Sequence, residues 1–130
     1  SLVIVLRDTD ARVRIQAALA LGALAGPNDP SALDALFDRV ARESSLKVLS
    51  TLIAAIGRLC TSERVLSLTS YLDHSDERIV SNCIEAIAQA RTPKAVDLLL
   101  PKLTSGNNRV RANAALALFG AGHFEVLGLL

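Results

Sequence analysis

One pattern of about twelve residues occurs four times along this chain. Residues 10–21 read DARVRIQAALAL and residues 107–118 read NNRVRANAALAL, and looser copies occupy residues 45–56 and 76–87. Self-similarity at a fixed period is the sequence signature of repeat proteins, in which one small unit stacks on copies of itself. The repeat therefore limits the chain to architectures that are built from stacked units.

Several columns agree when the four copies are aligned. The alignment is anchored on an apolar residue, with spacings of 35, 31 and 31 residues between Val13, Val48, Ile79 and Val110. A basic residue precedes each anchor: Arg12, Lys47, Arg78 and Arg109. A residue that favours a helix N-cap stands two positions earlier still: Asp10, Ser45, Asp76 and Asn107. An alanine follows seven positions after the anchor: Ala20, Ala55, Ala86 and Ala117.

A second amphipathic segment precedes these capped helices. Its apolar residues are three or four positions apart, as one face of an α-helix requires. They are Leu33, Leu36, Phe37 and Val40, then Val65, Leu68, Tyr71 and Leu72, then Val96, Leu99, Leu100 and Leu103. No stretch shows the alternation of a β-strand. We therefore predict an all-α fold in which a first helix, a tight turn, a second helix and a loop recur.

Prolines mark two of the first helices. Asp29-Pro30 and Thr92-Pro93 each place a capping residue before a proline at the first helical position. Pro101 instead falls inside a first helix, where it removes a backbone donor. We expect a kink near Asp97 there.

We treat residues 1–130 as a single domain. Its repeats are expected at about 1–26, 27–60, 61–91 and 92–122, with a partial unit at 123–130. Both ends carry apolar half-units and the chain contains no methionine. We interpret the chain as a fragment of a longer protein.

The pattern D-x-x-V-R-x-x-A-A-x-A-L, in helix pairs of about 31 residues, resembles the HEAT-repeat superfamily. It is most similar to the bacterial type that also occurs in phycobilisome-lyase-like repeats. The resemblance covers essentially the whole chain and is weaker where Leu49 and Val80 replace the second arginine. It implies a right-handed α-solenoid of about four helical hairpins, with partial repeats at both ends. First helices would line the convex side and second helices the concave side.

Charge and composition restrict the partners. The chain has 14 basic and 13 acidic residues, so its net charge of +1 gives no reason to expect nucleic acid or a membrane. No apolar run approaches the ~18 residues of a membrane-spanning helix, and we expect no membrane insertion. Cys60 and Cys83 are interpreted as reduced core thiols of a cytoplasmic protein, with a disulfide or redox role as the alternative.

A narrow polar arc remains on each second helix, since the helical wheel is apolar over roughly 200°. Stacking should align these arcs into a ribbon along the concave face, which we call the polar ribbon. Its candidate partner-binding residues are Arg12, Gln16, Lys47, Thr51, Arg58, Arg78, Asn82, Glu85, Arg109 and Asn113. Cations in the first turn oppose the helix dipole, which favours a binding role. The alternative is that they pair with turn acids and only solubilise this edge.

A second set of residues is expected to hold the fold together. It comprises the caps and the second arginine of the pattern: Asp10, Arg14, Asp76, Asn107 and Arg111. Arg14 and Arg111 lie inside the apolar arc. The resemblance implies that they reach the turns between helices and pair with acids or carbonyls of an adjacent repeat.

The residues provide little support for catalysis. His74 and His123 are far apart in the repeat scheme and lack a second ligand at metal spacing. Cys83 lies in a core column, and Glu85 is a single carboxylate in the ribbon. We predict no enzyme activity, metal or cofactor.

The leading functional hypothesis is a protein-interaction scaffold that binds an acidic or polar peptide, or a helical segment, in the concave groove. One alternative is a nucleic-acid-binding module similar to HEAT-like alkylpurine glycosylases, although clustered cations and stacking aromatics are missing. Another is a role like that of the chromophore lyases, although aromatics form only 3% of the chain and could hardly line a bilin pocket.

The inward and outward arginines of the last copy provide a first test. Arg111→Ala should lower the melting temperature more than Arg109→Ala, because the first removes a partly buried donor and the second an exposed one. Thermal unfolding of both variants measures this difference. Equal melting temperatures would contradict the assignment of the two arginines.

Overall fold

The structure is a computed structural model that describes residues 1–120, and every regular element in this range is a helix. The helices are α1 (Leu2–Val5), α2 (Ala11–Leu24), α3 (Pro30–Arg42), α4 (Leu46–Leu59), η1 (Glu63–Asp73), α5 (Glu77–Ala88), α6 (Pro93–Leu99), η2 (Leu100–Thr104) and α7 (Asn108–Gly120). The predicted all-α solenoid of helical hairpins is confirmed. The partial unit expected at 123–130 and His123 lie outside the described residues.

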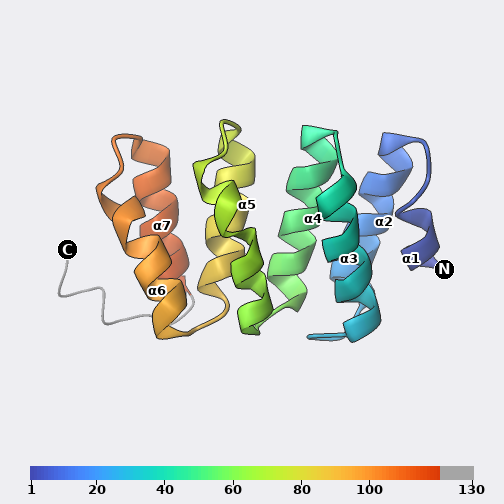
Figure 1. Ribbon diagram of the computed structural model, residues 1–130, viewed down its shortest axis with the longest axis horizontal. Coiled ribbons are helices and arrows are strands. Elements are labelled where there is room, and N and C mark those ends of the chain that lie inside the picture. The colour runs from blue at the N-terminus through green and yellow to red at the C-terminus, as the bar shows by residue number, and fades with distance from the viewer. Residues whose placement is uncertain (121–130) are drawn as a thin grey trace.

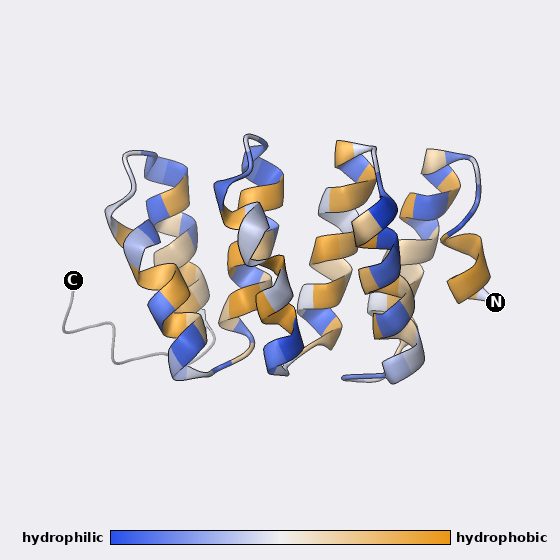
Figure 2. Ribbon diagram, viewed as in Figure 1, coloured by the Kyte–Doolittle hydropathy of each residue, from blue (hydrophilic) through white to orange (hydrophobic). Residues whose placement is uncertain are grey.

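The helices form two layers that extend along one axis (Figure 1). The first helices α1, α3, η1 and α6–η2 make the layer nearer the viewer, and α2, α4, α5 and α7 make the layer behind. Each first helix packs on its own second helix, and the second helices pack on one another in chain order. The turns between first and second helices all lie along one edge of the stack and are largely hydrophilic (Figure 2).

Each second helix begins at its expected cap. The cap side chain accepts a backbone N–H of the first turn: Asp10 from Arg12 at 2.8 Å, Ser45 from Val48 at 3.4 Å, Asp76 from Arg78 at 2.9 Å and Asn107 from Arg109 at 2.9 Å. Such caps satisfy amide groups that a helix start leaves without an intrahelical partner. Because all four caps lie at the same edge, the first-turn cations Arg12, Lys47, Arg78 and Arg109 emerge along that edge as well.

Small residues let the second helices approach closely. A Cβ added at Gly22 would lie 3.3 Å from the Ala55 Cβ, and one added at Gly57 would lie 3.2 Å from the Ala86 Cβ. Gly22 and Gly57 occupy the same position in successive repeats, and Ala55 and Ala86 belong to the alanine column of the alignment. That column is therefore the position against which the preceding second helix packs.

The first helix of the third repeat is wound as a 3₁₀ helix, η1, where the pattern predicted an amphipathic helix. Val65, Leu68 and Tyr71 are spaced by three, which matches the three residues per turn of a 3₁₀ helix and keeps all of them toward the core. The Thr69 hydroxyl donates to the Leu66 carbonyl at 2.5 Å, a local bond that competes with α-helical bonding.

Pro101 changes the type of helix instead of ending it. The α-helix α6 stops at Leu99, and the 3₁₀ helix η2 continues to Thr104 with Leu103 half-buried. Proline has no N–H to donate to the carbonyl four residues earlier, at Asp97. The helix type thus switches at Leu100, and the kink expected near Asp97 stays a prediction.

The close helix contact predicts a size limit at Ala86. Ala86→Leu should lower the free energy of unfolding by ~1–3 kcal/mol, because the fully buried alanine has no space for a larger side chain beside Gly57. Ala41→Leu, on the exposed side of α3, is the matched control and should change stability by less than about 0.5 kcal/mol. Chemical denaturation measures both, and equal effects would contradict the packing role of the column.

Candidate partner-binding surface

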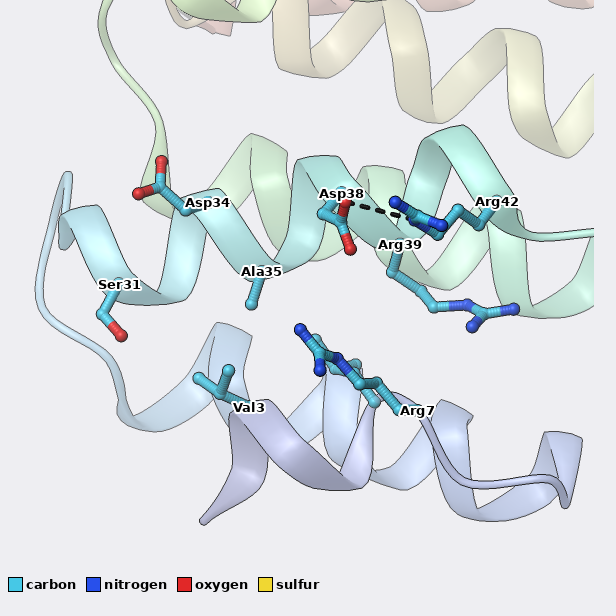
Figure 3. Close-up of a pocket in the computed structure, with 9 residues that line it drawn as sticks. Val3, Arg7, Ser31, Asp34, Ala35, Asp38, Arg39 and Arg42 are labelled. Carbon is cyan, nitrogen blue, oxygen red and sulfur yellow. Dashed lines mark hydrogen bonds and ion pairs between the residues drawn. The ribbon is translucent and has the colours of Figure 1, made fainter.

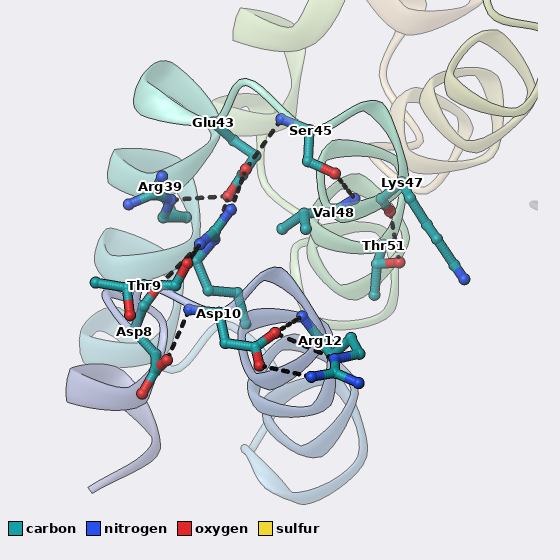
Figure 4. Close-up of polar contacts among 11 residues, drawn as sticks. Asp8, Thr9, Asp10, Arg12, Arg39, Glu43, Ser45, Lys47, Val48 and Thr51 are labelled. Carbon is teal, nitrogen blue, oxygen red and sulfur yellow. Dashed lines mark hydrogen bonds and ion pairs between the residues drawn. The ribbon is translucent and has the colours of Figure 1, made fainter.

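A buried ion pair between Arg14 and Glu43 joins the first repeat to the second (Figure 4). Arg14 donates from Nε and Nη2 to the two carboxylate oxygens of Glu43, each at 2.9 Å. Its Nη1 donates to the carbonyls of Asp8 and Thr9 at 2.9 and 3.1 Å. Arg14 is 9% exposed and the Glu43 side chain 0%. One guanidinium thus ties the turn of the first repeat to the end of α3.

Glu43 remains ionised in this setting. Burial on its own raises the pKa of Glu43, but hydrogen bonds from Arg14, the Ser45 amide and Arg39 outweigh burial and lower it. The Ser45 and Arg39 bonds measure 3.1 and 2.9 Å. These donors offset the desolvation cost of burying the carboxylate, so the buried ion pair is stable here.

Arg111 occupies the same column as Arg14 but makes different contacts. It is half-buried, and it donates to the Ser105 carbonyl at 2.6 Å and to the Asn108 side chain. Both partners belong to its own repeat, so the contact with an adjacent repeat that the resemblance implies is not made by Arg111 within residues 1–120. Its bond to the Ser105 carbonyl matches the bonds of Arg14 to the Asp8 and Thr9 carbonyls of its own turn.

The ten residues of the polar ribbon all lie on second helices. Seven are exposed: Arg12, Gln16, Lys47, Arg58, Arg78, Glu85 and Arg109. Three are half-buried: Thr51, Asn82 and Asn113. Contacts and surface hollows divide the ribbon into separate groups with different roles.

Two of the four first-turn cations are already paired. Arg12 contacts its own cap Asp10 at 3.1 Å, and Arg109 contacts Glu77 of the preceding repeat at 2.8 Å. Lys47 and Arg78 make no ion pair among the described residues, and Figure 4 shows Lys47 extending away from the labelled side chains. The pairing with acids that the alternative interpretation expects is therefore made by Arg12 and Arg109, and not by Lys47 or Arg78 within residues 1–120.

These contacts lower the pKa values of the paired acids Asp10 and Glu77. A hydrogen bond from the Arg12 side chain lowers the pKa of Asp10. Hydrogen bonds from Asn107 and then Arg109 lower the pKa of Glu77. Glu77 was not among the predicted site residues, although it stands 30 residues, about one repeat, before Asn107.

The amide column links neighbouring second helices. Asn82 donates from Nδ2 to the Ser50 carbonyl at 2.8 Å, and Asn113 donates to the Ser81 hydroxyl. Both bonds join residues that are 32 positions apart. Ser50 and Ser81 were also missed, although both stand two positions after an anchor of the alignment. Asn82 and Asn113 thus contribute to stacking as well as to the surface.

An open depression of about 560 Å³ lies where the starts of α4, α5 and α7 meet. We call it the basic depression, and its lining residues are Leu46, Lys47, Ser50, Asp76, Glu77, Arg78 and Arg109. Glu77 is engaged by Arg109, and Asp76 accepts the backbone N–H groups of Arg78 and Ile79. The cations without an ion pair in this depression are Lys47 and Arg78.

A second, much smaller hollow of about 30 Å³ lies between α2 and α4. We call it the apolar dimple, and its lining residues are Ala18, Leu19, Gly22, Thr51, Ala54, Ala55 and Arg58. Leu19 is 45% exposed. An aliphatic surface beside exposed cations is a combination that protein partners can use.

A larger hollow, of about 1040 Å³, lies in the other layer between α1 and α3 (Figure 3). Its charged side chains are largely paired: Arg42 with Asp38 at 3.2 Å, Arg39 with Glu43 at 2.9 Å, and Asp34 with Arg64 at 2.7 Å. Arg7 also lines this hollow and makes no ion pair within residues 1–120, so the hollow presents one unpaired cation where the basic depression presents two.

The remaining candidates for chemistry have structural contacts. Cys60 and Cys83 are free and buried, and burial raises the pKa of Cys83 to about 12. The His74 Nδ1 accepts the Asp76 backbone N–H at 2.9 Å. Residues 1–120 contain no group of three or more His, Cys, Asp or Glu that could hold a metal ion. Ion pairing and hydrogen bonding are the chemistry that this surface provides.

None of the helices in the described range is long and apolar enough to cross a bilayer. A family model described as HEAT repeats matches residues 34–119, which extend from α3 to α7. A comparison with curated proteins finds no match. The family description names no subtype, so the resemblance to the bacterial type stays a prediction.

The buried ion pair predicts a large difference between neighbouring arginines. Arg14→Ala should lower the free energy of unfolding at pH 7 by about 3 kcal/mol, because it leaves a buried carboxylate with only part of its donors. Arg12→Ala, which removes an exposed cation, is the matched control and should have little effect. Denaturation of both variants tests this, and equal losses would contradict it.

The same pair predicts a dependence on pH. The pKa of Glu43 is lowered in the folded state, so its contribution is complete above its ordinary value of 4.5 and is lost as the pH falls below that value. The stability difference between wild type and Arg14→Ala should therefore narrow below about pH 4.5. A difference that stays constant from pH 7 to pH 3 would show that the ion pair does not cause it.

Proposed function

The chain belongs to the HEAT-repeat family, and from this premise we propose that it is a non-catalytic scaffold that binds an acidic or polar segment of another protein along the polar ribbon. HEAT repeats commonly serve as protein-interaction scaffolds, because stacked helices present extended and rigid surfaces. One observation carries the proposal: Lys47 and Arg78 are exposed in one depression and make no ion pair within residues 1–120.

The pairing of the other cations supports this choice. Arg12 and Arg109 have carboxylate partners at 3.1 and 2.8 Å, so the fold supplies acids at this edge where cations need only be neutralised. Lys47 and Arg78 stand at equivalent positions and make no ion pair within residues 1–120. Ser45 replaces the acid before Lys47, and Asp76 before Arg78 accepts the backbone N–H groups of Arg78 and Ile79. An incoming carboxylate would complete the same pattern of pairing. Attraction between exposed charges is screened by salt, so the binding should weaken as ionic strength rises.

Rigid placement adds to the suitability of this surface. Lys47 lies in the first turn of α4 and Arg78 in the first turn of α5, and these two helices pack directly on each other. Asn82 also bonds α5 to α4 through the Ser50 carbonyl. Groups held on packed helices lose little freedom on binding, so more of the contact energy remains as affinity.

The alternatives lack a specific supporting observation. A nucleic-acid partner would also meet the cations, but the chain has one tyrosine and three phenylalanines, and the ring of Phe37 is covered by Arg64 at 4.5 Å. The same scarcity of aromatics argues against a bilin pocket. A cytoplasmic location, expected from two free buried cysteines, is part of the proposal.

A display library of random 15-residue peptides tests the proposal, with the chain as bait. Selected peptides should be enriched in Asp and Glu, and the double variant Lys47→Glu/Arg78→Glu should bind them at least about tenfold more weakly. The matched control is Arg7→Glu/Lys94→Glu, which makes the same change of net charge outside the polar ribbon and should leave affinity within about twofold.

Affinity is measured by fluorescence anisotropy at two salt concentrations. Unaltered affinity of Lys47→Glu/Arg78→Glu would contradict the assignment of the surface. Stronger binding of a duplex DNA fragment than of any selected peptide would favour the nucleic-acid alternative instead.

A further inference from the structure

Building on the proposed function, we infer that the polar ribbon recognises a bipartite segment in extended conformation. An aliphatic side chain occupies the apolar dimple, and a carboxylate about four residues away occupies the basic depression. The partner is thus a short acidic motif with one aliphatic anchor.

The apolar dimple exists because of the close approach of α2 and α4. Gly22 has no side chain and lies against Ala55, so a shallow hollow remains on the surface between the two helices. Leu19 forms one wall, and the aliphatic part of Arg58 approaches Gly22 from α4. A volume of about 30 Å³ accepts a methyl-sized group. The dimple therefore suits the tip of Val, Leu or Ile better than an aromatic ring.

The basic depression provides the second position. Lys47 and Arg78 come from adjacent helices and line the same hollow, so one carboxylate can contact both. The two acids of the lining are compensated, Glu77 by Arg109 at 2.8 Å and Asp76 by two backbone N–H groups at 2.9 and 3.0 Å. Repulsion of an incoming carboxylate is thereby reduced.

Helix geometry sets the distance between the two positions. Lys47 and Ala54 are on α4, seven residues or ~10 Å apart along the helix axis. The hollows lie in neighbouring grooves, α2/α4 and α4/α5, which adds a lateral offset of ~9 Å at ordinary helix spacing. The diagonal is ~14 Å, which an extended chain covers in about four residues.

The groups near this diagonal favour an extended segment over a helix. Asn82 donates its N–H to the Ser50 carbonyl, and no donor within residues 1–120 reaches its side-chain oxygen. That oxygen can accept a backbone N–H of the partner. An extended segment has free backbone N–H groups, whereas those of a helix are used internally.

Double-mutant cycles test the inference with peptides from the display library and the full chain. Leu19→Ser should weaken binding about tenfold, and the loss should disappear when the aliphatic residue of the peptide is replaced by serine. Arg78→Gln should behave in the same way with the acidic residue of the peptide. The effect of Leu19→Ser should add to that of replacing the acidic peptide residue, and the effect of Arg78→Gln should add to that of replacing the aliphatic one. Two glycines inserted between the two peptide residues should weaken binding about tenfold. Thermal unfolding checks that both exposed variants remain folded.

The outcomes separate the two proposals. Peptides that bind the wild type but show no coupling to Leu19, or that tolerate the inserted glycines, overturn the bipartite motif and leave the scaffold function standing. Preference for helix-stabilised peptides also overturns the motif. Failure to select any peptide contradicts both proposals.

Discussion

The structure depends on the close contact between successive second helices. Gly22 against Ala55 and Gly57 against Ala86 bring backbones together with no intervening side chain. A helix that is apolar over most of its surface can then bury that surface on two neighbours and on its own first helix. This contact also sets which residues of adjacent repeats face each other. The polar contacts between second helices, such as that of Asn82 with the Ser50 carbonyl, depend on this close approach.

The ion pairs between repeats share one property, a separation of about one repeat. Arg14 with Glu43 and Lys102 with Asp73 are 29 residues apart, Arg64 with Asp34 are 30 apart, and Arg109 with Glu77 are 32 apart. They compensate charges where repeats meet. Lys47 and Arg78 stand out because their equivalents are paired and they are not, within residues 1–120. The candidate function thus arises where a repeated pattern of pairing is incomplete.

The parts that the sequence predicted well depend on neighbours along the chain. Caps such as Asp10 and Asp76 act within three residues, and the 31-residue period marks the helix pairs directly. The 3₁₀ winding of η1 was not predicted, because Val65, Leu68, Tyr71 and Leu72 contain spacings of both three and four residues. Glu77 was missed since its importance comes from Arg109, one repeat later.

The sequence by itself determined the repeat, the order of helices, their caps and the residues that each second helix turns outward, because period and capping are local properties of the chain. Arg12 finds an acid in its own cap two residues away, but only the tertiary structure decided that Arg109 finds one in the preceding repeat. Arg12, Lys47, Arg78 and Arg109 are equivalent in the alignment, yet two are paired and two line the basic depression without an ion pair. The reason is physical: Coulomb attraction acts through space over a few ångströms, and stacking rather than sequence position brings Glu77 within that range of Arg109.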